Sequence, residues 1–131
     1  MKNTIINSSL LKRLKETYKE GTRVQLESMD DAQAPPKGTK GSVQFVDDIG
    51  TIHVKWDNGS ILGLVYGQDS CWILRTVTTV CYGEKRVWDS REDAMSYFLE
   101  GILNCEGSER DRYATVYAGL KNGGDYVTDG D

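Results

Sequence analysis

The stretch from Val46 to Ser60, which reads VDDIGTIHVKWDNGS, limits the possible folds more than any other part of the chain. Within it, Ile52, Val54 and Trp56 alternate with polar residues. A strand with this two-residue period has one face to bury and one face to expose to water. Asn58-Gly59 follows, and this dipeptide favours a tight hairpin turn because it tolerates positive φ angles. The stretch therefore predicts a central strand between two turns.

Four further short strands are expected around the central one. Their alternating patterns fall at Arg23–Glu27, Gly41–Val46, Ile61–Val65 and Cys71–Leu74. In the second of them, we expect Val43 and Phe45 to share one face. A short helix should precede the strands, with Leu14 and Tyr18 on its apolar side and Gly21 at its end. Five short strands, tight turns and a short N-terminal helix together predict a small SH3-like β-barrel.

The segment Met29–Gly38, which reads MDDAQAPPKG, is expected to be a long loop between two of these strands. Two adjacent prolines exclude a strand or helix interior, because neither residue has a backbone N–H to donate. Long loops on small domains often carry binding residues. The candidates for contact with a partner are Asp30, Asp31, Pro35 and Pro36. A simple connection between strands is an equally good interpretation.

These features together resemble a known family of small bacterial domains, domain of unknown function 4314. The residues that carry the resemblance are Gly21–Val24, Pro35–Gly41, the Val46–Ser60 stretch and Leu62–Leu64, so it covers roughly residues 18 to 74. The resemblance implies an SH3-like module that is common in bacterial mobile elements and phages. It carries over no activity, cofactor or catalytic residue.

The rest of the chain has a different pattern. It predicts a β-hairpin that turns at Gly83-Glu84, a helix that Asp89 or Ser90 caps, and a second helix that Ser108 caps and Asn122-Gly123 ends. Tyr126–Thr128 can add an edge strand. The expected fold class is therefore α+β, with an SH3-like barrel and N-terminal helix in residues 1–75 and a ββαα unit in residues 76–131.

The two predicted parts differ in charge. Residues 1–75 hold ten Lys or Arg and nine Asp or Glu, whereas residues 76–131 hold six and eleven. An acidic surface speeds encounter with a basic protein surface, although solubility is the more common reason for such a charge. The candidate partner-binding residues are Glu106, Glu109, Asp111 and Asp125.

No catalytic, cofactor or metal site is predicted. His53 is the only histidine, and it lies on the expected wet face of its strand without an acid or thiol predicted beside it. Three widely spaced cysteines, Cys71, Cys81 and Cys105, fit free thiols better than a disulfide framework or a metal site. The sequence therefore gives no support to an enzyme.

The favoured function is a non-enzymatic protein-binding module from a phage or mobile element, in one form an inhibitor of a host defence nuclease in the manner of anti-CRISPR proteins. The alternative is a nucleic-acid-binding accessory protein that uses Lys37, Lys40, Lys55 and the basic helix face. The net charge of -4 counts against it. The wide apolar face of the first ββαα helix, which includes Leu103, also allows a homodimer.

We expect a cytoplasmic protein without membrane contact. No apolar run approaches the roughly 20 residues needed to span a bilayer. The first residues, MKNTIINSSLLKRLKE, lack the apolar core of a signal peptide.

Overall fold

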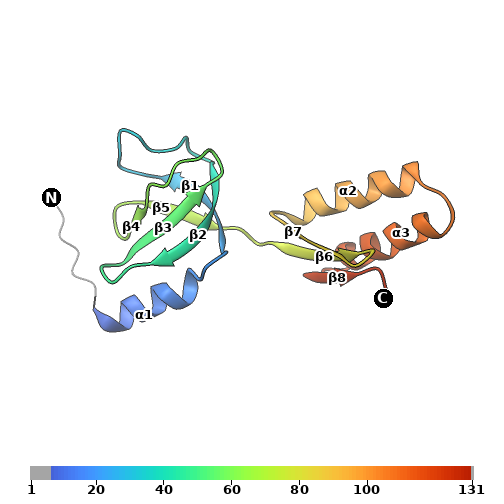
Figure 1. Cartoon of the computed structure of the whole chain (residues 1–131), viewed down its shortest axis with the longest axis horizontal. Coiled ribbons are helices and arrows are strands. Elements are labelled where there is room, and N and C mark those ends of the chain that lie inside the picture. Colours follow the sequence, from blue (N-terminus) through green and yellow to red (C-terminus); the bar gives the residue numbers. More distant parts are fainter. Residues whose placement is uncertain (1–6, 131) are drawn as a thin grey trace. The chain divides into compact units, whose positions relative to one another are not determined.

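A computed structural model describes residues 7–130 of the chain. The chain divides after Leu74 into two units, here termed unit 1 (Met1–Leu74) and unit 2 (Arg75–Asp131). The described residues form three helices and two separate sheets, so the fold is α+β as predicted (Figure 1).

In its described part, unit 1 has one helix and five strands. Their bounds are α1 Ser8–Thr17, β1 Arg23–Ser28, β2 Lys40–Val46, β3 Thr51–Trp56, β4 Leu64–Val65 and β5 Ser70–Ile73. The strands pair antiparallel in the order β4-β3-β2-β1-β5. Because β4 and β5 are the edges of this sheet, the strands form an open sheet and not a closed barrel.

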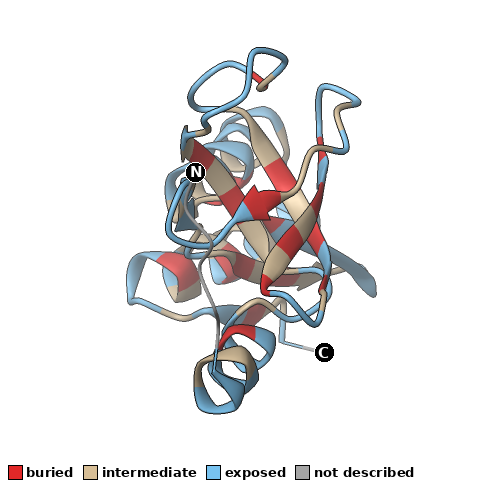
Figure 2. Ribbon diagram, turned by 90° about the vertical axis from the view of Figure 1, so that its left-hand side faces the viewer, coloured by how far each residue is buried: buried red, intermediate tan, exposed pale blue. Residues whose placement is uncertain are grey.

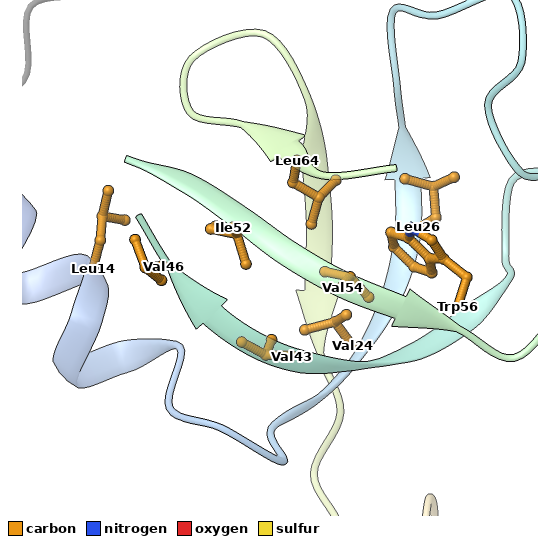
Figure 3. Packing of buried hydrophobic residues seen from close by; sticks show 9 residues of the cluster. All are labelled: Leu14, Val24, Leu26, Val43, Val46, Ile52, Val54, Trp56 and Leu64. Carbon is orange, nitrogen blue, oxygen red and sulfur yellow. The ribbon is translucent and has the colours of Figure 1, made fainter. Parts of the chain in front are cut away.

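The predicted central strand is confirmed as β3, and its apolar side forms the core of unit 1. Ile52, Val54 and Trp56 are all buried (Figure 3), and buried positions alternate with less buried ones along β1 and β3 (Figure 2). The indole Nε1–H of Trp56 donates to the Leu62 carbonyl at 2.8 Å. Gly41 lies opposite on β2, where a Cβ atom would come within 2.8 Å of the Trp56 ring. This close approach requires glycine at position 41.

The prediction that Val43 and Phe45 share a face is wrong. The register between β2 and β3 shifts between these two residues, and Phe45 is 53% exposed while Val46 is buried in its place. Such a bulge inserts one residue and reverses the facing of all that follow. At the strand after Asn58-Gly59, only Leu64–Val65 of the predicted segment pairs with β3.

The N-terminal helix is confirmed, but it ends earlier than predicted. Asn7 caps α1 by accepting a hydrogen bond from Leu10 N at 2.8 Å. The helix stops at Thr17 instead of running to Gly21. Leu14 is buried and Tyr18 packs against the same core, so the apolar side of the helix was placed correctly.

Unit 2 has two helices on one face of a three-stranded sheet, in the part of it that the structure describes. The bounds are β6 Val77–Cys81, β7 Glu84–Trp88, α2 Arg91–Asn104, α3 Gly107–Lys121 and β8 Tyr126–Thr128. The strand order is β7-β6-β8, and β8 runs parallel to β6 (Figure 1). The predicted hairpin, helix pair and edge strand are therefore all present.

Both helices of unit 2 contribute to its core. The buried residues from helices and strands are Val77, Trp88, Ala94, Phe98, Val116, Leu120 and Val127. Leu103 on α2 is 74% exposed. The apolar face of α2 is thus wider than its contact with the rest of unit 2, and the predicted homodimer stays a prediction.

The hairpin of unit 2 turns one residue earlier than predicted. Tyr82 and Gly83 occupy the turn with φ angles of 54° and 73°, whereas Glu84 already belongs to β7. Two consecutive positive φ angles are the signature of the tight hairpin turn whose twist matches that of the strands. The glycine was recognised in the sequence, but its position within the turn was not.

One predicted helix cap of unit 2 is confirmed and the other is wrong. Ser90 caps α2 by accepting a hydrogen bond from Asp93 N at 3.1 Å. At α3, the capping position is Glu106 instead of Ser108, and the Glu106 side chain makes no capping hydrogen bond. The capping position therefore lies two residues before Ser108, the polar residue that the sequence pattern favoured.

Candidate functional site

A row of five aromatic rings runs across unit 2. Successive ring centroids lie 6.4 Å apart for Tyr82 and Tyr113, 5.9 Å for Tyr113 and Phe98, 5.1 Å for Phe98 and Tyr97, and 5.2 Å for Tyr97 and Trp88. The rings come from the hairpin turn, α3, α2 and β7. Tilted and edge-to-face pairs at these distances attract one another. The row, here termed the aromatic row, therefore joins the hairpin to both helices.

The alternation of β7 determines which side chains meet this row. Trp88 pairs with Val77 and Arg86 pairs with Thr79 across the hairpin, so both project toward the helices. The indole Nε1–H of Trp88 donates to Thr79 Oγ1 at 3.0 Å, and both residues are buried. This hydrogen bond satisfies the one polar atom of the indole and fixes the ring.

Two guanidinium groups lie over rings of the aromatic row. Arg86 Cζ is 4.0 Å from the Trp88 ring centroid and 5.0 Å from that of Tyr97. Arg112 Cζ is 4.5 Å from the Tyr82 centroid and also pairs with Asp129 at 2.9 Å. A cation within about 6 Å of a ring centroid is attracted by the negative face of the ring. The row therefore already accommodates two cations of its own chain.

A small hollow, here termed the aromatic pocket, opens between the sheet and the two helices. Its walls include Glu84, Arg86, Trp88, Tyr97 and Tyr113, and its volume is about 90 Å³. Sites for drug-sized ligands usually measure about 300 to 1,000 Å³. The aromatic pocket is thus the size of one side chain and too small for a nucleotide or a larger cofactor.

A second hollow, here termed the helix groove, lies between α2 and α3. Its lining residues are Tyr97, Glu100, Gly101, Asn104, Cys105 and Tyr113. Tyr97 and Tyr113 line both this groove and the aromatic pocket. A Cβ atom at Gly101 would lie 2.7 Å from the Tyr113 ring. Glycine at this position therefore lets the ring pack against α2.

The lining of these two hollows, here termed the aromatic–acidic surface, carries more negative than positive charge. Glu84 lines the aromatic pocket and Glu100 lines the helix groove. Glu109 accepts a hydrogen bond from the Tyr113 hydroxyl at 3.2 Å. Burial, and then this contact with Glu109, raises the pKa of Tyr113 to about 12. Tyr113 therefore remains a neutral hydrogen-bond donor, and in the lining of the two hollows Glu84 and Glu100 outnumber Arg86.

Three of the four predicted partner-binding residues are close in sequence to residues that line this surface. Glu109 touches it through Tyr113, and Glu106 and Asp111 are exposed at the start of α3. Asp125 has a partner within unit 2, because Arg91 pairs with it at 2.6 Å. The role of these residues in binding stays a prediction.

The contacts of Arg91 place Asp125 at the C-terminal end of α3. The same guanidinium donates to the carbonyl oxygens of Leu120 at 2.8 Å and Gly124 at 2.7 Å. The last carbonyls of a helix have no partner within the helix. Arg91 and Asp125 together therefore close the end of α3.

The predicted contact loop is held by hydrogen bonds of unit 1. Asp31 Oδ1 accepts from Gln33 N at 2.7 Å, and Asp30 N donates to Asp69 Oδ1 at 2.9 Å. Pro35 is buried, whereas Pro36 and the two aspartates are exposed. Of the four predicted contact residues, Pro35 is thus not accessible to a partner.

His53 has an acid beside it, in contrast to the prediction. Its Nε2 lies 2.8 Å from Asp47 Oδ2, and its ring stacks on Phe45 with centroids 4.3 Å apart. Burial by itself raises the pKa of Asp47, but hydrogen bonds from His53 and from the N–H groups of Thr51 and Ile49 lower it overall. Asp47 is thus an ionised partner of His53 that also stabilises the turn between β2 and β3.

The cysteines are free thiols, as predicted. Burial raises the pKa of all three, Cys71, Cys81 and Cys105. A thiol with a raised pKa is a poor nucleophile and a poor metal ligand at neutral pH, because the thiolate is the reactive form. Among residues 7–130, no group of three or more His, Cys, Asp or Glu side chains is arranged to hold a metal ion.

The sequence did not predict the aromatic row or the position of Arg86. Part of it could have been predicted, because the two-residue alternation of β7 places Glu84, Arg86 and Trp88 on one side of the strand. The contribution of Tyr97 and Tyr113 could not have been predicted, because these residues meet only through the packing of α2 on α3.

The described residues contain no helix that could span a membrane.

The fold is that of an α+β protein. Unit 1 has a helix and an open five-stranded sheet, and unit 2, which follows it in the sequence, is a second α+β unit. The family model described as Domain of unknown function (DUF4314) matches residues 7–74, just over half of the chain. The chain therefore belongs to this family. The aromatic–acidic surface lies in unit 2, outside the matched residues. No curated protein and no solved structure matches the chain.

Proposed function

We propose that this chain is a non-enzymatic protein-binding module, and that the aromatic–acidic surface binds a basic segment of a partner protein. The observation that carries the proposal is the guanidinium of Arg86 over the Trp88 and Tyr97 rings. A lysine or arginine of a partner meets the same combination of ring faces and carboxylates there.

The strength of such contacts determines how many basic residues the partner segment needs. A cation over an exposed ring contributes about 0.5 to 1 kcal/mol, and an exposed ion pair about 0.2 to 1 kcal/mol. One basic side chain therefore binds weakly, and useful affinity requires several of them. A partner segment with two or more Lys or Arg residues fits an extended surface with Glu84 at one hollow and Glu100 at the other.

The non-enzymatic part of the proposal rests on how the reactive groups are used. Each cysteine thiol has a raised pKa. His53 contacts Asp47, whose other oxygen accepts from backbone N–H groups of the turn. These groups hold the fold together in ways that account for their positions without a reaction.

A narrower form of the proposal is an SH3-like phage or mobile-element protein that inhibits a host defence nuclease, in the manner of anti-CRISPR proteins. Five short antiparallel strands and the long loop before β2 support the SH3-like part. A nuclease has a basic surface for its nucleic acid, and an acidic protein surface is complementary to it. The aromatic–acidic surface supplies that charge.

A titration of the full chain with an arginine-rich peptide tests the main proposal. We expect saturable binding that weakens as salt is added, because exposed charges are screened. The double reversal Glu100→Lys and Glu109→Lys should weaken binding on the order of tenfold, since it replaces two attractions by repulsions. Glu16→Lys on α1 is the matched control for one such charge change, and it should have little effect.

Two results contradict the proposal. One is the absence of binding by the wild-type chain at low salt. The other is an equal loss of affinity in Glu16→Lys and in Glu109→Lys, which would mean that net charge alone attracts the peptide.

The same titration with single-stranded DNA tests the nucleic-acid alternative. Two cations of the sheet in unit 1 lie near an aspartate, because Arg23 pairs with Asp57 at 2.6 Å and Lys40 also lowers the pKa of Asp57, to a smaller extent than Arg23 does. Since these charges are partly neutralised, we expect DNA to bind more weakly than the peptide. Tighter binding of DNA that Lys55→Glu abolishes would favour the alternative.

A further inference from the structure

Arg86 occupies an unusual position for a charged residue. On β7 it alternates with Lys85 and Val87, and its cross-strand neighbour Thr79 is buried beneath the helices. The side chain therefore projects from the side of the sheet that faces the helices. Trp88, two residues further along β7, projects from the same side and belongs to the core. An apolar residue at position 86 could fill the aromatic pocket permanently.

Aromatic rings hold the guanidinium in place. It lies over Trp88 and Tyr97, and among residues 7–130 no ion pair to Arg86 was found. The residue as a whole is exposed. A cation–π contact at an exposed site is weak enough to exchange. Arg86 therefore covers the pocket without closing it.

We propose that the aromatic pocket is a binding site for one lysine or arginine side chain of the partner, and that Arg86 is the resident occupant which this side chain displaces. The inference rests on the proposed function and names the ligand chemistry and the internal competitor of that site. Arg86 and Glu84 both belong to the pocket wall. The free volume of about 90 Å³ beside the guanidinium, together with the space that Arg86 vacates, accommodates one side chain, and Glu84 supplies a carboxylate for the incoming cation.

The exchange predicts the direction of a mutation. If Arg86 competes with the partner, its removal leaves the ring faces free, and Arg86→Ala binds a basic peptide more tightly than the wild type. The expected gain is about two- to fivefold, the range that corresponds to one exposed cation–π contact. Arg86→Lys should lie between the two, because lysine keeps the charge but stacks less well on rings than arginine.

The experiment is a titration of the full chain with the arginine-rich peptide, followed by NMR. The indole N–H signal of Trp88 is the reporter, because this N–H is fixed on Thr79 at 3.0 Å directly below the guanidinium. The matched control is Lys85→Ala, which removes the same charge from the adjacent residue on the opposite face of β7. Urea unfolding of each variant confirms that unit 2 is folded.

We expect the Trp88 signal to shift in the wild type and Arg86→Ala to tighten binding, with little change in Lys85→Ala. Equal tightening in Lys85→Ala would overturn the exchange, because net charge would then explain both. Weaker binding of Arg86→Ala would also overturn it, since Arg86 would then contact the partner itself.

The two proposals fail in different ways. Peptide binding that depends on Glu100 and Glu109 but leaves the Trp88 signal unmoved would retain the protein-binding function and reject the exchange. If the peptide binds to neither the wild type nor Arg86→Ala, the proposed function itself is rejected. Tyr97→Ala provides a second check, because without that ring the gain from Arg86→Ala should shrink.

Discussion

Replacing Trp56 by alanine should remove a large part of the stability of unit 1. The side chain is 1% exposed and packs in the core beside Val54 and Leu26 (Figure 3). A buried aromatic side chain removes about 150 to 250 Å² from water, which at about 25 cal/mol per Å² is worth roughly 4 to 6 kcal/mol. The alanine side chain still buries part of this area, so the expected loss in the free energy of unfolding is about 3 to 5 kcal/mol.

The lost hydrogen bond adds to this expectation. Trp56 Nε1 donates to the Leu62 carbonyl at 2.8 Å, and its removal leaves that carbonyl without this donor, at a cost of about 1 kcal/mol. Because a whole domain is stable by only about 5 to 15 kcal/mol, Trp56→Ala could unfold unit 1. Trp56→Phe keeps an aromatic ring and should lose less, about 1 to 3 kcal/mol.

Hydrogen exchange in increasing denaturant is the suitable assay, because it reports the amides of β2 and β3 separately from those of unit 2. A single transition cannot be assumed for a chain with two units. Trp72→Ala is the matched control, since the same residue type on β5 is 60% exposed, and it should cost less than about 1 kcal/mol. A loss below about 1 kcal/mol for Trp56→Ala, or an equal loss for both variants, would refute the core assignment.

Three further predictions concern unit 2. Arg91→Ala should lower its free energy of unfolding by about 1.5 to 3 kcal/mol, because the end of α3 loses its charged donor; thermal unfolding measures this. Acid should also destabilise it: the hydrogen bond from Arg112 holds the pKa of Asp129 below its ordinary value of 3.8. The stability that this carboxylate provides is complete above that value and is lost as the pH falls through the lower folded value, so Asp129→Asn should flatten the acid limb of a pH titration. Gly101→Ala should displace the Tyr113 ring, since the added Cβ lies 2.7 Å from it, and a shift of the Tyr113 ring signals without global unfolding would confirm this; unchanged signals would contradict it.

Some features of the fold followed from short sequence patterns. The alternation of Ile52, Val54 and Trp56 predicted β3 and its buried face, and the cap of α2 at Ser90 was recognised from residues within one turn of helix. These features depend on neighbours in the chain, so a local pattern contains the information. The family resemblance over the first half of the chain rested on the same local turns and strands, and the family match at residues 7–74 agrees with it.

Other features depended on partners that local patterns do not specify. The bulge that turns Phe45 outward arises because β2 must bury both Val43 and Val46 while it pairs with β3. The same shift places Phe45 against His53. The alternation of a single strand predicts an isolated His53, because it does not specify which residues the paired strand places beside it.

The candidate site shows the same division. The sequence by itself determined that the second half of the chain is acidic and forms a hairpin with two helices. Only the tertiary structure decided that Trp88 and Tyr97 lie beneath the guanidinium of Arg86 and that Tyr113 lines the same pocket. The physical reason is that charge and periodicity are properties of the chain, whereas a pocket forms from side chains of separate elements that meet only when α2 packs on α3 and on the sheet.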